Sequence, residues 1–335
     1  MEAYLPQNLN SLITSNIDDV EILIINDGSK DRTSEIGHEY ERRYPNSIRI
    51  IDKANGHYGS CVNCGVANAT GKYIKILDAD DSFDTQNFEE FVTFLKESDA
   101  DMVLSAFSFV SPDGIVFRTK KFNTSGNHRN LSFEDGLHLL IDDLLEMHSI
   151  TYKLSVVREM QYRQLEGIAY TDIQWRFTPM LNVNSISCFN KVIYRYLVGR
   201  DGQSVDEETF NRSIKEHLLL ADELLTQYAA YLPQISTCQK IYAGSDILRL
   251  MQFLYKNVLS LREHDKYYSR LFALDQRLKQ INSDLYREAG RIRISSSINY
   301  PFIEYWRSKY SRQQRMPLIS LYRLILKLQK AIKSR

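Results

Sequence analysis

Two groups of aspartates directly follow apolar segments in the first half of the chain. Asp27 comes after the aliphatic run at residues 20–25, and Asp78 and Asp80 come after residues 72–77. Carboxylates one residue apart can converge on one hard divalent cation, Mg²⁺ or Mn²⁺, where a strand breaks into a turn. A solvated turn rich in aspartate is the alternative, and the pair by itself does not decide between the two.

A segment of glycines and small residues lies between these two aspartate groups. Residues 56–60 read Gly-His-Tyr-Gly-Ser and begin a stretch with the composition of a helix. The amino end of such a helix can hold a phosphate group, or the glycines can serve tight packing, and the sequence leaves both open. The segment is neither a Walker loop nor a G-x-G-x-x-G fingerprint, which disfavours nucleotide hydrolases and NAD enzymes.

Strands and helices alternate through the part of the chain that holds these motifs. The hydrophobic pattern predicts strands at residues 20–25, 47–52, 72–77 and 102–110, and helices at 31–44, 59–69 and 87–97. This alternation predicts the α/β class, with a mostly parallel sheet covered by helices on both faces. Such sheets bind ligands beyond the carboxyl ends of their strands, where both aspartate groups fall.

The composition and the hydrophobic pattern of the sequence change near residue 206. Glycine becomes scarce and apolar residues recur at helical spacing, as in Ile247, Leu248, Met251, Leu254, Tyr255 and Val258. We therefore expect two parts, an α/β domain at residues 1–205 and a helical region at residues 206–335.

Composition excludes several classes of protein. Of 335 residues, 43% are hydrophobic and 25% are charged, which excludes wholesale disorder and a collagen-like fibre. No apolar run reaches the length of a membrane-spanning helix, and the first residues do not read as a signal peptide. Four cysteines suit a reducing cytoplasm, and Cys61 and Cys64 are interpreted as packing residues because a zinc site would need a second pair.

The formal net charge is zero, but the charge is unevenly distributed. Residues 287–335 hold twelve Lys and Arg against two acidic residues, so the rest of the chain carries a net charge of −10. Within residues 316–335, leucines and isoleucines lie beside a basic stripe of Arg323, Lys327, Lys330 and Lys333. Such a helix can lie on an anionic membrane surface, or it can pack its leucines on the body of the protein. Nucleic acid is a disfavoured partner, since the chain has no recognition helix or aromatic-interleaved basic motif.

Four segments, taken in order, resemble the inverting GT-A glycosyltransferases of family 2. They are "VEILIINDGSKDRT", "NGHYGSCVNCGVANATGKYIKILDADD", "GIAYTDIQW" and "YRYLVGRDGQS", and the resemblance covers residues 2–205. It implies the GT-A fold, a nucleotide diphosphate sugar as donor (a UDP-sugar in the first place) and Mn²⁺ or Mg²⁺ as cofactor. The implied acceptor is a hydroxyl of a bacterial surface glycan or of a lipid-linked glycan.

The resemblance also implies roles for individual residues. Asp27 matches the aspartate that contacts the nucleotide base, and Asn55 begins the matching N-x-G-x-G segment that faces the donor. Asp78 and Asp80 match the D-x-D, with Asp78 near the ribose and shared with the metal, and Asp80 as metal ligand. The implied catalytic base is Asp172.

Two further residues are weaker expectations from the same resemblance. His148 matches a position that often faces donor or acceptor, with an ordinary structural histidine as the alternative. Arg200 falls in a loop that closes over the diphosphate in relatives. In this chemistry the metal neutralises the leaving group and the base takes the proton of the attacking hydroxyl, which suits a single displacement with inversion.

The chain departs from the family pattern at its start. Family members begin with a strand ending in a Pro-x-Tyr-Asn-like motif, whereas this sequence starts at the helix that follows that strand. The expectation is therefore a GT-A domain without its first strand. A non-catalytic module that binds sugar nucleotides or glycans is the alternative function, and the expected location is cytoplasmic, with a peripheral position on the inner face of the membrane if the tail binds lipid.

Overall fold

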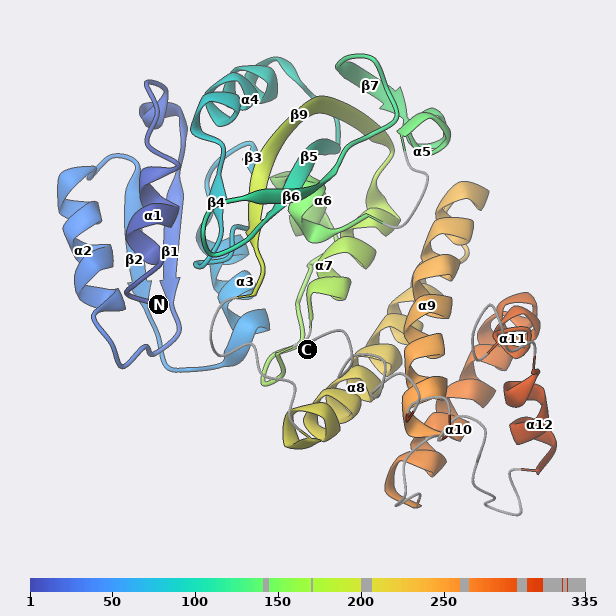
Figure 1. Ribbon diagram of the computed structural model, residues 1–335. Helices are drawn as coiled ribbons and strands as arrows, with labels where there is room; N and C mark the ends of the chain where they lie inside the picture. The colour runs from blue at the N-terminus through green and yellow to red at the C-terminus, as the bar shows by residue number, and fades with distance from the viewer. Residues whose placement is uncertain are drawn as a thin grey trace. The chain divides into compact units, whose positions relative to one another are not determined.

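The chain forms two compact units, Met1–Ser204 and Val205–Arg335 (Figure 1). The structure is a computed structural model, and it describes residues 1–140, 145–169, 171–199, 207–259, 265–293 and 300–309, together with residues 321 and 324. Each unit is treated by itself below.

The first unit begins with a small parallel sheet between helices. Its elements are α1 (Leu5–Asn10), β1 (Ile22–Asn26), α2 (Thr33–Arg43), β2 (Ile48–Asp52) and α3 (His57–Asn68). β1 and β2 pair in parallel, with Ile22 opposite Ile48 and Asn26 opposite Asp52. Their carboxyl ends therefore lie side by side, so the residues that follow the two strands can meet.

A seven-stranded sheet makes up the rest of this unit. Its strand order is β3-β8-β5-β9-β4, with β6 added to β5 and β7 added to β9. The strands are β3 (Tyr73–Ile74), β4 (Ser82–Phe83), β5 (Met102–Val110), β6 (Val116–Lys120), β7 (His128–Ser132), β8 (Ile150–Lys153) and β9 (Ser185–Leu197). The helices between them are α4 (Thr85–Glu97), α5 (Phe133–Leu140), α6 (Leu154–Glu159) and α7 (Asp172–Phe177), with 3₁₀ turns η1 (Ile17–Asp19), η2 (Met147–Ser149) and η3 (Pro179–Asn182).

The α/β class is confirmed, but the sheet is mixed where the sequence predicted a mostly parallel one. β1–β2 and β5–β9 are parallel, whereas β3–β8, β4–β9, β5–β6, β5–β8 and β7–β9 are antiparallel. Residues 111–115 between β5 and β6 leave room for a hairpin only, and a hairpin joins antiparallel strands. The strand predicted at 72–77 is also shorter, because its ladder with β8 covers only Tyr73 and Ile74.

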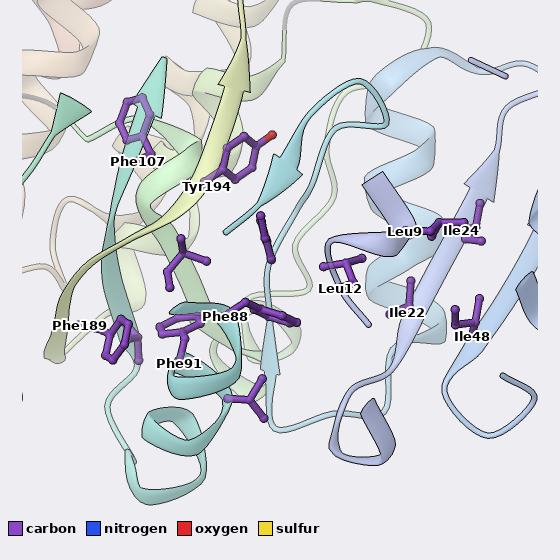
Figure 2. Close-up of a cluster of buried hydrophobic side chains, with 14 of the residues drawn as sticks. Leu9, Leu12, Ile22, Ile24, Ile48, Phe88, Phe91, Phe107, Phe189 and Tyr194 are labelled. Atoms are coloured by element: carbon purple, nitrogen blue, oxygen red, sulfur yellow. The ribbon is translucent and has the colours of Figure 1, made fainter. Parts of the chain in front are cut away.

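One apolar cluster joins the small sheet to the large one. In Figure 2, Leu9 and Leu12 lie between the small sheet, with Ile22, Ile24 and Ile48, and the aromatic side chains of the large sheet and α4. These aromatic residues are Phe83, Phe88, Phe91, Phe94, Phe107, Phe189 and Tyr194. Burying this much apolar surface is what fixes the strand ends relative to one another.

The second unit is helical in the residues that the structure describes. It contains α8 (Glu207–Tyr231), α9 (Thr237–Val258), α10 (Asp265–Ile281), α11 (Ser283–Gly290) and α12 (Phe302–Lys309). Arg307 of α12 donates to the fully buried Asp275 of α10 at 2.6 Å, and the Tyr255 hydroxyl of α9 donates to the same carboxylate at 2.5 Å. This charged pair links three helices inside an apolar core.

Most of the basic tail lies outside the described residues. Of residues 316–335, the structure describes Leu321 and Leu324, which are helical and each 53% exposed. Across the described part of the chain, every helix falls short of the length and apolar character needed to cross a bilayer.

Candidate functional site

Asp27 is held in a polar network at the carboxyl ends of β1 and β2. Its Oδ1 accepts hydrogen bonds from Lys53 Nζ at 2.6 Å and from the Gly56 N–H at 2.9 Å. The Asn55 side chain donates to the carbonyl oxygen of Asp27 at 3.0 Å. Partial burial works against the charge of Asp27, but the hydrogen bonds from Lys53 and Gly56 outweigh it and lower the pKa of its carboxyl. The carboxylate is therefore ionised and fixed in direction.

The turn after β1 depends on Gly28. This residue has φ +72°, and a Cβ there would lie 3.2 Å from the backbone nitrogen of Asn55. Glycine adopts this left-handed conformation without steric penalty, so Asp27 and Asn55 can approach each other.

The turn with Asp78 and Asp80 is anchored from two directions. The side-chain amide of Asn8 donates to the carbonyl oxygens of Asp78 at 2.9 Å and Asp81 at 3.0 Å. On the other side, the Tyr194 hydroxyl donates to Asp81 Oδ2 at 2.5 Å and accepts from the Asp78 N–H at 3.2 Å. Asp81, which is 3% exposed, therefore joins the turn to β9 and has a structural role.

Three carboxylates act electrostatically on Asp78, and we call Asp78, Asp80, Asp81 and Asp172 the carboxylate cluster. Burial, and then the charges of Asp81, Asp80 and Asp172, raise the pKa of Asp78 to about 8. Asp172 therefore acts electrostatically on Asp78, although the two are far apart in the sequence. Carboxylate oxygens are the ligands that Mg²⁺ and Mn²⁺ prefer, so Asp78 and Asp80 fit these cations by ligand type. Among the described residues, no three members of the cluster bring their carboxylate oxygens within 4.8 Å of one another.

Asp172 is the first residue of α7 and is exposed. A buried amide network positions the loop before it. Gln164 Nε2 donates to the Thr171 carbonyl oxygen at 3.0 Å and to its hydroxyl at 2.8 Å, while Gln164 Oε1 accepts from the Tyr162 hydroxyl at 2.7 Å. Gln174 Oε1 accepts from the Leu165 N–H at 2.9 Å. These contacts fix the backbone that presents Asp172.

His148 lies in an aromatic stack and is partly buried. Its ring is 4.7 Å from the Tyr194 ring, 4.4 Å from Tyr196 and 5.0 Å from Phe107. Burial, and then the charge of Lys75, lower the pKa of His148 to about 3, so the ring is neutral near pH 7. Its Nδ1 is buried and finds no hydrogen-bond partner among the described residues. The structure connects His148 to the carboxylate cluster through Tyr194.

The glycine segment at the start of α3 is explained by packing. A Cβ on Gly59 would lie 1.8 Å from the carbonyl oxygen of Leu165, and the Gly167 N–H donates to the Gly56 carbonyl oxygen at 3.1 Å. The helix begins at His57, two residues before the predicted start, and His57 has φ +64°. Of the two alternatives for residues 56–60, the structure thus supports close contact with the loop at 163–167.

A hollow of about 750 Å³ adjoins α3 and the segment 157–166. Its lining includes Lys53, Asn55, Asn63, Arg158 and Arg163, and none of the four residues of the carboxylate cluster. Lys53 and Asn55 both contact Asp27, so the hollow borders the Asp27 network.

Arg200 lies outside the residues that the structure describes. Cys61 and Cys64 are free and partly buried in α3, and burial raises the pKa of the Cys61 thiol to about 11, which suits packing residues.

Sequence reasoning missed three residues that shape the site. Lys53 follows β2 as Asp27 follows β1, so parallel pairing of the two strands was the available signal. Lys75, whose ammonium donates to the carbonyl oxygens of His148 at 2.7 Å and Ile150 at 3.1 Å, is an unusual cation inside an apolar strand sequence. Tyr194 gave no local signal, because its partners lie more than one hundred residues away.

Comparison with known proteins identifies the family. Residues 2–145 match the model of glycosyl transferase family 2. The uncharacterized glycosyltransferase YibD of Escherichia coli is 28% identical over 195 residues, which are 56% of each chain. The minor teichoic acid biosynthesis protein GgaB of Bacillus subtilis is 29% identical over 143 residues, 42% of this chain and 16% of GgaB. This chain therefore spans little more than half of the one relative and about a sixth of the other.

Solved structures establish the fold independently. The crystal structure of S. aureus TarS 1–349 in complex with UDP superimposes with a TM-score of 0.63 at 18% sequence identity, covering 93% of this chain and 89% of TarS. The ordered motifs, the matched family model and this superposition lead to one assignment. Over residues 2–145 the chain matches glycosyl transferase family 2, and its first unit has the GT-A fold.

Proposed function

We propose that this protein transfers a sugar from a nucleoside diphosphate sugar, a UDP-sugar in the first place, to a hydroxyl group of a surface glycan or lipid-linked acceptor. The observation that carries the proposal is the D-x-D turn, which Asn8 and Tyr194 hold at the end of a strand. The charge of Asp172 also acts on Asp78 in this turn. The likeness to TarS, whose crystal structure holds UDP, supports the choice of donor, and the relative named for teichoic acid biosynthesis supports a glycan acceptor.

Asp78 and Asp80 are the residues that would hold Mg²⁺ or Mn²⁺. Two carboxylates leave most of the coordination shell to diphosphate oxygens and water, as is usual for these cations. When bound, the cation neutralises charge on the departing diphosphate. Asn8 and Tyr194 hold the turn in place by hydrogen bonds to its backbone and to Asp81. The ligands are thus preorganised by groups that do not bind the metal.

The Asp27 network is the proposed contact for the nucleotide base. An ionised carboxylate held in direction by Lys53 and Gly56 can accept a further hydrogen bond from a base N–H. Asn55 holds the Asp27 backbone at this place. Lys53 adds a cation at the same edge of the sheet.

Asp172 is the proposed general base. It is exposed at the first turn of α7, where an acceptor hydroxyl can reach it, and the Gln164 network holds the loop that presents it. Transfer by direct attack of the hydroxyl on the anomeric carbon needs one such base and leads to inversion. Removal of the proton by Asp172 completes the step as the nucleoside diphosphate leaves.

A panel of UDP-, dTDP- and GDP-sugars tests this function. With Mn²⁺ and an acceptor extract from bacterial envelopes, we expect release of nucleoside diphosphate from one class of donor, and loss of release in excess EDTA. Full release in EDTA would refute the metal assignment. Binding of a nucleotide sugar without any transfer would identify the non-catalytic module instead.

A further inference from the structure

A row of aromatic rings runs along one face of the large sheet, and we call Tyr196, Phe109 and Phe117 the aromatic row. Tyr194, on the same strand as Tyr196, is fully buried beneath it. In the parallel register of β5 and β9, Phe107 lies opposite Tyr194 and Phe109 opposite Tyr196, so these side chains share a face. The Phe109 ring is 5.7 Å from Tyr196 and 6.2 Å from Phe117. Figure 2 shows Phe107 and Tyr194 on these two neighbouring strands.

The inner end of the row lies at the carboxylate cluster. The Tyr194 hydroxyl contacts both Asp81 and the backbone of Asp78. Burial first, and then the charges of all four members of the carboxylate cluster, raise the pKa of the Tyr196 hydroxyl. The N–H of Leu197, the residue after Tyr196, donates to Asp81 Oδ1 at 2.7 Å, so Tyr196 adjoins this turn.

The outer end of the row is open to solvent. Phe117 is 57% exposed, and its neighbours Ile115 and Val116 are 61% and 45% exposed. Within the described residues, Ile115 precedes β6, and β6 pairs with β5. Phe117 lies next to the Phe109 ring, so its exposed ring extends the row to the surface and offers a contact for a ligand.

Polar groups accompany the rings at this end. The Arg118 guanidinium lies over the Phe109 ring, 4.9 Å from its centre, and Arg118 is opposite Phe109 in the register of β5 and β6. Apolar ring faces beside hydrogen-bond donors suit a ligand with one apolar face and hydroxyl edges. A pyranose ring has this character, since its C–H groups can contact an aromatic face while its hydroxyls meet Arg118 and water.

We propose that the aromatic row binds the sugar rings of the acceptor, with Phe117 as its outermost contact. The proposal rests on the proposed function, because continuity with the carboxylate cluster is what selects a glycan as the occupant. An acceptor lying along the row from Phe117 to Tyr196 has its end at the turn that holds Asp78 and Asp81. The surface thus extends the site from the reacting hydroxyl to the preceding sugars of the acceptor glycan.

Direct binding tests the proposal without an acceptor being known. Saturation-transfer NMR would use millimolar methyl β-glycosides of glucose, galactose, N-acetylglucosamine and N-acetylgalactosamine as probes. We expect at least one to bind the full chain, Phe117→Ala to weaken that binding about tenfold through loss of the ring contact, and Phe117→Trp to retain it. Leu139→Ala, which removes a similarly exposed side chain of α5 (44%), is the matched control and should leave binding unchanged.

A parallel measurement separates this proposal from the donor assignment. The shift in melting temperature caused by UDP with Mn²⁺ should be the same in all four proteins. If UDP fails to bind while glycosides still bind through Phe117, the donor function is refuted and the glycan surface stands. No glycoside binding, binding indifferent to Phe117→Ala, or a dimer that Phe117→Ala converts to monomer in sedimentation velocity would each overturn the glycan surface.

Discussion

Lys75 is a cation held inside the first unit by backbone carbonyls. Its ammonium donates to His148 and Ile150 and lies 5.8 Å from the centre of the Tyr194 ring. Burial lowers the pKa of Lys75 to about 7. An unfolded lysine keeps its proton to about pH 10.4, so between these values the unfolded state binds more protons than the folded state. Lys75 therefore makes the free energy of unfolding rise with pH in that window.

Replacing Lys75 by methionine should flatten this dependence. The wild-type gain from Lys75 between pH 7 and pH 9 is about 2 kcal/mol, and Lys75→Met should lose it. Melting temperatures of the first unit at the two pH values measure the effect. Lys191→Met, which removes an exposed lysine of β9, is the control and should keep the wild-type slope. Equal slopes in wild type and Lys75→Met would contradict a buried, readily deprotonated Lys75.

Asp172→Asn should separate chemistry from donor binding. The amide keeps the size of the side chain but accepts no proton, so transfer should fall by about 10²–10⁴-fold. The affinity for UDP should stay the same, since Asp172 is assigned to the acceptor hydroxyl. Initial rates and UDP titrations of this variant measure both quantities, with Asp18→Asn, an exposed aspartate of η1, as the matched control. Near-normal turnover would show that Asp172 is not the general base.

Among individual residues, the sequence predicted the acidic ones and missed their hydrogen-bond partners. Aspartates directly after apolar strands are visible as a local pattern, which is how Asp27, Asp78 and Asp80 were found. Asn8 and Tyr194 hold the D-x-D turn from 70 and 113 or more residues away, and only sheet pairing brings them there. Such long-range partners leave no periodic signal.

The loop before α7 is the element on which the proposed base depends. Gln164, Thr171 and Gln174 are at most 1% exposed, so their hydrogen bonds are made away from water. Gln164→Leu keeps the volume but leaves Thr171 and Tyr162 without these partners, at a cost of about 1–3 kcal/mol per unsatisfied buried group.

We expect Gln164→Leu to lower the melting temperature and to reduce kcat for transfer more than the affinity for UDP. Thermal unfolding and steady-state kinetics measure the two effects, and Gln7→Leu at an exposed position of α1 is the control. A variant that loses stability but transfers sugar at the normal rate would show that the loop does not position Asp172.

Local chemistry also explains where the predicted elements differ from the observed ones. α4 begins at Thr85, two residues before the predicted start, because the Asp84 side chain caps it by accepting from the Asn87 N–H at 3.1 Å. β5 has the predicted bounds, since every residue from Met102 to Val110 except the partly buried Phe109 is buried. The mixed sheet escaped prediction because strand direction is set by connections and pairing, which single segments do not encode.

For the whole molecule, the open question is whether the basic tail binds a membrane. Leu321 and Leu324, each 53% exposed, are available to an apolar surface. Each basic residue near an anionic surface contributes about 1 kcal/mol, so Arg323, Lys327, Lys330 and Lys333 together can hold the chain there.

We expect the full chain to sediment with liposomes that contain phosphatidylglycerol, and less with neutral phosphatidylcholine liposomes. A chain truncated after Arg315 should stay in the supernatant. Equal sedimentation of both chains would assign the tail to packing within the protein.

The central claim is that a nucleoside diphosphate and a divalent cation bind together at the carboxyl ends of the strands in the first unit. Calorimetric titration of UDP into the full chain tests it most directly, with Mn²⁺ and then with excess EDTA, for wild type, Asp80→Asn and the control Asp18→Asn. The account predicts binding with Mn²⁺ in wild type and in Asp18→Asn, and binding weakened by about tenfold or more in EDTA and in Asp80→Asn, because a charge-assisted contact to the metal is lost. UDP binding of equal strength in all of these, or no binding in any, would contradict it.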